Sequence, residues 1–138
     1  MPVFNIFTKE KKRQQEMLSI AKLSYKNERR KFLELEKKYH ISDSENDIVG
    51  CLVSTINLMV DDLRLALRAK LSLEEEATLY RSSASTISKA NSFMNKFLVF
   101  KKIGKREFEE AKAIEDAAFY KASEFSKLFA NASSVKTL

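Results

Sequence analysis

Apolar residues recur along most of the chain at alternating steps of three and four positions, which is the spacing of one face of an α-helix. Four stretches carry such a stripe, and short polar breaks separate them. The pattern predicts helices over residues 9–39, 44–70, 73–102 and 106–130. We expect the two ends of the chain, residues 1–8 and 131–138, to be frayed.

The stripes of the first and third predicted helices each contain one polar residue. In the first helix, the stripe is Leu18, Ala21, Tyr25, Phe32, Leu35 and Tyr39, and Glu28 occupies the missing position. We interpret Glu28 as a point where the stripe drifts to the surface. Asn91 occupies such a position in the third helix, where two interpretations stay open: a surface drift, or a buried Asn that sets the register between helices.

The second predicted helix has the widest apolar face and is expected to be the most buried. Its apolar residues are Ile48, Val49, Leu52, Val53, Ile56, Met59, Val60, Leu63 and Leu67, with Leu58 and Leu65 widening the face. Cys51 lies within this run and suits a small buried hydrophobic residue. The run is too short to span a bilayer.

Polar residues at the breaks indicate where the helices begin and end. Ser42 with Glu45, and Ser72 with Glu75, have the spacing of capping boxes. Gly104 stands where a glycine ends a helix, just past the third predicted helix. A continuous helix through Gly104 is the alternative.

These features predict an all-α fold, an elongated antiparallel four-helix bundle in one domain over residues 1–138. Small stripe residues predict a close approach of the third and fourth helices: Ala77, Ala84, Ala111, Ala118 and Ala122. Two dimeric forms stay open. A continuous helix through Gly104 predicts a hairpin-swapped homodimer, and long helices that bury their stripes against a second copy predict a side-by-side homodimer.

Composition excludes several function classes. The chain has 138 residues with only 2 Gly and 1 Pro, too few turn residues for an all-β fold. One Cys and one His cannot build a zinc site, and no glycine-rich phosphate loop is present. We therefore expect no enzyme, no metal and no cofactor. The single cysteine and the lack of a signal-peptide pattern lead us to expect a cytoplasmic protein.

The net charge of +6 is concentrated in the first predicted helix. Residues 1–40 hold 11 Lys and Arg against 5 Asp and Glu, whereas the rest of the chain is neutral. On a helical projection, seven of these cations fall within an arc of about 100°. They are Lys11, Lys12, Lys22, Lys26, Arg29, Arg30 and Lys37. A second basic cluster, expected at the same end of the bundle as the end of the first helix, contains Lys96, Lys101, Lys102, Lys105 and Arg106.

A localised basic surface indicates an acidic partner. Our first interpretation is a non-enzymatic interaction protein, of the adaptor, chaperone or inhibitor type, that docks an acidic or apolar surface of another protein. The alternative is nucleic-acid binding through the basic face of the first helix. A second alternative is peripheral association with an anionic membrane surface. In that case Phe4, Ile6 and Phe7 insert into the lipid and the following cations meet its headgroups.

Overall fold

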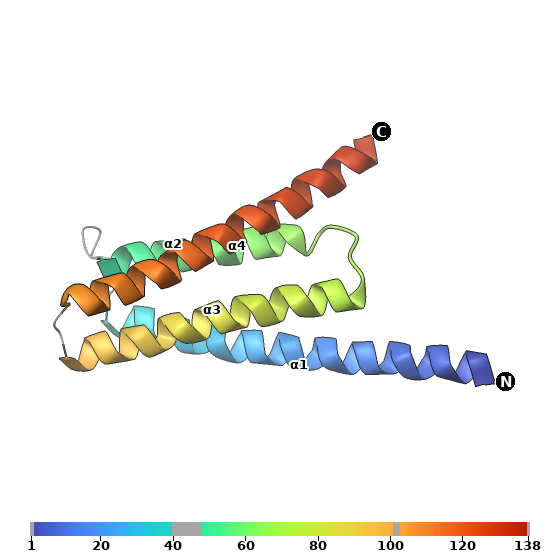
Figure 1. Cartoon of the computed structure of the whole chain (residues 1–138), viewed down its shortest axis with the longest axis horizontal. Coiled ribbons are helices and arrows are strands. Elements are labelled where there is room, and N and C mark those ends of the chain that lie inside the picture. Colours follow the sequence, from blue (N-terminus) through green and yellow to red (C-terminus); the bar gives the residue numbers. More distant parts are fainter. Residues whose placement is uncertain (1, 40–47, 101–102, 138) are drawn as a thin grey trace.

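The computed structural model describes the backbone of residues 2–39, 48–100 and 103–137, and the side chains of residues 8–38, 48–97 and 103–131. Four helices account for nearly all of these residues: α1 (Pro2–Tyr39), α2 (Ile48–Ala66), α3 (Leu73–Phe100) and α4 (Lys105–Thr137). Consecutive helices run in opposite directions along an elongated molecule (Figure 1). The predicted all-α, antiparallel four-helix bundle is therefore confirmed.

The helices that pack most closely are not consecutive in the chain. Most close contacts join α1 to α3 and α2 to α4, whereas α3 touches α4 and α2 over smaller areas. Each close pair runs in parallel, and the two pairs form two layers (Figure 1). Within the chain, α4 packs on α2, and α3 contacts helices of both layers.

Small side chains explain this pairing, because they let two helix backbones approach. Ala77 of α3 lies in one buried cluster with Leu18 and Ala21 of α1. In α4, the alanines Ala111, Ala118 and Ala122 are buried in the main core with α2. The alanines were predicted to bring α3 close to α4, and this choice of partners was wrong. The alanine of α3 packs on α1, and the alanines of α4 pack on α2.

Three helix ends differ from their predicted positions. α1 begins at Pro2, because proline is well tolerated in the first turn of a helix. α2 ends at Ala66 instead of residue 70, and tighter turns follow, with the amide of Ala69 bonded to the carbonyl of Ala66. α4 continues to Thr137. The described backbone of residues 2–8 and 131–137 is helical.

The caps follow the sequence in one case and differ in another. Ser72 and Glu75 form the predicted capping box, with reciprocal bonds of 3.1 Å between backbone amides and side chains. Ser42 and Glu45 lie outside the described residues. Gly104 lies between α3 and α4, so the two helices are not continuous there. Its amide donates to Glu107 Oε2 at 3.1 Å and its carbonyl accepts from Phe108, so it is the N-cap of α4.

The core runs along α2, as its wide apolar face predicted. Leu52, Ile56 and Met59 are fully buried. Leu58 is an exception at 43% exposure, since it lies on the opposite side of the helix from those residues. Cys51 is exposed, so the expectation of a buried cysteine was wrong for the same reason. In the described residues, no helix has an apolar stretch long enough to cross a membrane.

Candidate partner-binding face of α1

The seven cations predicted to share one arc of α1, here called the basic face, differ in their surroundings. Five are exposed to solvent: Lys11, Lys12, Lys26, Arg30 and Lys37. Lys22 and Arg29 are half-buried. The basic face is therefore largely exposed to solvent, and only Lys22 and Arg29 are partly covered by the rest of the bundle.

Lys22 turns toward α3. Its ammonium nitrogen lies 5.9 Å from the centre of the Tyr80 ring, a cation–π arrangement. Tyr80 also meets Tyr25 of α1 edge-on, with ring centres 5.4 Å apart. Lys22 is thus partly committed to the α1–α3 contact, which leaves less of its charge available to a partner.

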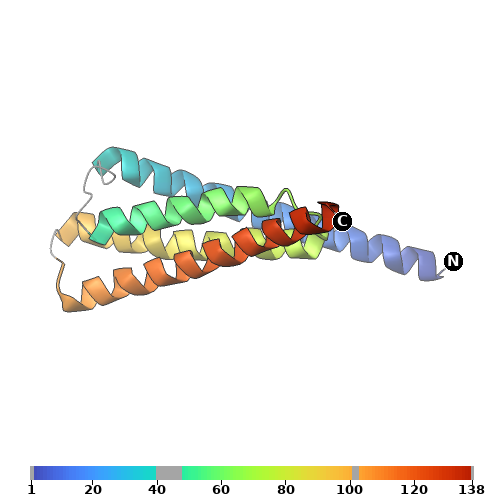
Figure 2. The same ribbon diagram turned by 90° about the horizontal axis from the view of Figure 1, so that it is seen from above.

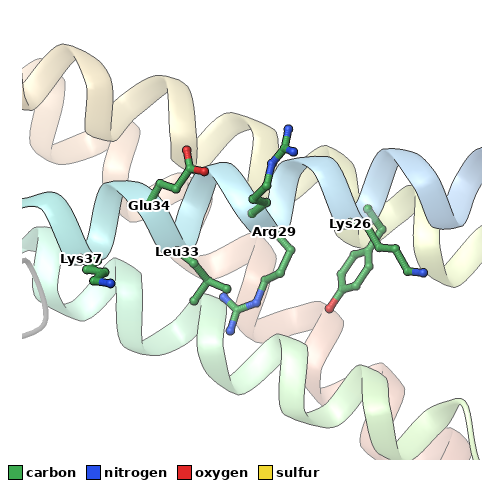
Figure 3. A pocket seen from close by; sticks show the side chains of 7 residues that line it. Lys26, Arg29, Leu33, Glu34 and Lys37 are labelled. Atoms are coloured by element: carbon green, nitrogen blue, oxygen red, sulfur yellow. The ribbon is translucent and has the colours of Figure 1, made fainter.

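Arg29 lies beside a cavity on the basic face. The cavity has a volume of about 340 Å³ and all its lining residues belong to α1: Tyr25, Lys26, Arg29, Arg30, Leu33, Glu34 and Lys37. Figure 3 shows how these side chains spread along the helix, with Arg29 and Leu33 on the side toward α2. Four cations and one carboxylate therefore surround a hollow whose walls include an aromatic ring and a leucine.

The guanidinium of Arg29 is incompletely paired. It stacks 5.3 Å from the centre of the Phe32 ring. Its Nε and Nη1 atoms are buried and have no hydrogen-bond partner among the described residues. Burial lowers the pKa of Arg29, while Tyr25 and Glu36 act in the opposite direction. Arginine stays charged in proteins, so a cation with unsatisfied donors borders the cavity.

Tyr25 forms a neutral wall of the same cavity. Burial raises the pKa of its phenol, an effect opposed by the positive charges of Arg29 and Arg64. The ring therefore offers an apolar surface and an un-ionised hydroxyl near neutral pH.

Two described residues of the second basic cluster, Lys105 and Arg106, lie apart from this face. Lys105 and Arg106 are exposed at the start of α4, at the same end of the bundle as the end of α1. Figure 2 shows α1 and α4 at opposite edges of that end, with other helices between them. Lys101 and Lys102 lie outside the described residues, as do the side chains of Phe4, Ile6 and Phe7, although α1 includes those three positions.

Sequence reasoning did not single out Lys121, which connects two helices. Its ammonium group donates to the carbonyl of Ser82 at 2.8 Å and to the hydroxyl of Thr86. Burial and the charge of Lys89 lower its pKa. A lysine among the exposed charges of α4 carries no sequence signal for this role, because only the packing of α4 on α3 brings these groups together.

Metal-ligating side chains do not cluster in the part of the chain that the structure describes. Within those ranges, no group of three or more His, Cys, Asp and Glu side chains is placed to hold a metal ion. Cys51 is exposed on the surface of α2. The functional feature with the clearest geometry is therefore the basic face of α1 with its cavity. No family model, curated protein or solved structure compared with this chain matches it.

Proposed function

We propose that this protein is a non-enzymatic docking protein of the cytoplasm, which binds an acidic segment of a partner protein along the basic face of α1. The observation that carries the proposal is the cavity between Tyr25 and Lys37, where four cations surround apolar walls. Clustered cations attract an acidic partner from a distance, and the apolar walls add short-range contact.

Apolar residues beside the charges favour a protein partner over a nucleic acid. Ile20, Leu23 and Leu33 of α1 are exposed at 68%, 60% and 47%. Leu33 lines the cavity itself. Phosphate contacts need donors and positive charge and gain little from leucine side chains, whereas the centres of protein interfaces combine apolar, aromatic and arginine residues.

Carboxylates on α1 also favour a protein partner over a nucleic acid. Glu34 lines the cavity, and Glu16 lies on the neighbouring side of the helix. A continuous polyphosphate would meet repulsion at these positions. A protein segment can place its acidic residues beside the cations and its other residues beside the glutamates.

The test is capture of partners from lysate of the source cells by the tagged protein, after nuclease treatment and at two salt concentrations. The variant K26Q/R30Q/K37Q removes three charges from the basic face. The matched control K70Q/K89Q/K112Q removes three exposed charges elsewhere. We expect a nuclease-resistant protein partner that the first variant loses and the control retains.

Two results would replace the proposal. Loss of all bound material on nuclease treatment, with a steep dependence on salt, would favour the nucleic-acid alternative. Binding to anionic vesicles that depends on Phe4, Ile6 and Phe7 would favour the membrane alternative. A protein partner held equally by both charge variants would show that the basic face is not the docking surface.

A further inference from the structure

We propose that Arg29 is the anchor of the docking surface, and that its cavity receives one aspartate or glutamate side chain next to an apolar residue of the bound segment. This inference rests on the proposed function and adds a specific ligand group to it. The juxtaposition that supports it is a guanidinium with unpaired donors beside a cavity with cationic edges and apolar walls.

The first step of the argument is the hydrogen-bonding state of Arg29. Nε and Nη1 are both buried and lack a partner among the described residues. A buried donor without an acceptor is costly, and the cost is larger when the donor is charged. Both atoms are hidden from solvent in the structure, so we infer that the side chain turns toward the neighbouring cavity when an acceptor enters it.

The second step is that the nearby acids of the chain do not fill this role. Asp61 of α2 lies close enough to influence the charge of Arg29, but its carboxylate is 3.6 Å from the guanidinium of Arg64. Glu36 also influences the charge of Arg29, and neither acid bonds to it within the described contacts. Because no acid among the described residues supplies the acceptor, we infer that it comes from the bound partner segment.

The third step is the chemistry of that acceptor. A carboxylate matches the planar guanidinium and can accept two hydrogen bonds from it. Lys26, Arg30 and Lys37 line the cavity and attract the same group. Tyr25 and Leu33 provide apolar surface in the same hollow, which suits an apolar neighbour of the acidic residue. An acidic residue beside an apolar residue in a protein segment supplies the carboxylate, the negative charge and the apolar contact.

The experiment uses a labelled peptide of alternating Glu and Leu residues, a control peptide with Gln in place of Glu, and a single-stranded oligonucleotide of equal charge. Binding to the full chain is followed by fluorescence anisotropy. NMR follows the Nε–H signals of the arginines during titration. We expect the Glu peptide alone to bind, and the Arg29 signal to shift more than that of Arg30.

Two single variants test the role of Arg29. R29M should weaken Glu-peptide binding by about tenfold, because a charge-assisted hydrogen bond in a partly buried site is lost. R30M removes the same charge from an exposed position of the same cavity and should weaken binding by about twofold. The thermal midpoint of R29M should equal or exceed that of the wild type, because the substitution also removes the unpaired donors.

Each failure has a distinct meaning. If R29M binds like the wild type while K26Q/R30Q/K37Q does not, the anchor role is wrong and the docking proposal stands. If no variant alters binding, or the Glu peptide does not bind the wild type, both are wrong. Binding of the oligonucleotide in place of the peptide would also overturn the anchor role. A lower thermal midpoint for R29M, with unchanged binding by the folded protein, would show that Arg29 only supports the fold.

Discussion

Asn91 of α3 donates two hydrogen bonds to Glu28 of α1, one to its backbone carbonyl at 3.0 Å and one to its carboxylate Oε2 at 3.1 Å. These are the two polar residues on the apolar stripes of α1 and α3, and they meet where these two helices pack on each other. Glu28 also pairs with Lys31 at 3.3 Å. The interpretation of Glu28 as a surface drift was therefore wrong, and Asn91 is buried.

This pair leads to a stability prediction. N91A should lower the free energy of unfolding by about 1–3 kcal/mol, because it removes two hydrogen bonds between α3 and α1, one of them to a partly buried carboxylate. The control E28Q keeps an acceptor oxygen and should cost less. Urea denaturation of both variants provides the comparison, and a loss below about 0.5 kcal/mol for N91A would show that the pair is not a stabilising contact.

The burial of α2 predicts the effect of core truncations. L52A and L63A should each lower the free energy of unfolding by about 2–5 kcal/mol, because both side chains are almost fully buried and their loss leaves cavities. L58A removes a leucine from the exposed side of the same helix and serves as the matched control. If L58A costs as much as the other two in denaturant titrations, the orientation of α2 is wrong.

The capping box at the start of α3 predicts a smaller effect. S72A removes the hydroxyl that accepts from the amide of Glu75 and should cost about 0.5–2 kcal/mol of stability. S54A changes an exposed serine inside α2 and should be nearly neutral. Thermal denaturation followed by circular dichroism measures both variants. Equal midpoints for S72A and the wild type would show that the box contributes nothing measurable.

Lys121 predicts a dependence of stability on pH. Its pKa in the folded protein is lowered from the ordinary value of 10.5, so the unfolded chain holds this proton at pH values where the folded protein has begun to release it. The contribution of Lys121 to the free energy of unfolding therefore rises with pH in the window just below 10.5. Below that window, Lys121 is charged in both states and its burial remains unfavourable.

The variant K121M should remove the rise of the free energy of unfolding with pH that Lys121 causes. The phenols of Tyr25 and Tyr80 have raised pKa values and act in the opposite direction above their ordinary value of 10.0, so the difference between wild type and variant isolates the lysine. Urea titrations from about pH 8 to pH 10 measure this difference. A difference that stays constant over the range would show that Lys121 does not titrate differently in the two states.

The candidate site was predictable in part. Helical periodicity placed the seven cations on one arc of α1, because charge and angle along a helix are both read from the sequence. It did not separate Arg29 from Arg30. Their distinction depends on Phe32, on the cavity and on the approach of α2, and none of these follows from the spacing of charges along one helix.

The sequence by itself determined the helical class, the number of helices and most of their positions, because propensity, periodicity and capping are local properties. The tertiary structure decided which helices pair. An apolar stripe predicts that a helix face is buried, but it does not predict which other helix covers that face. The alanines therefore serve the α1–α3 and α2–α4 contacts, and the same packing joins Asn91 to Glu28 and leaves Arg29 beside an open cavity.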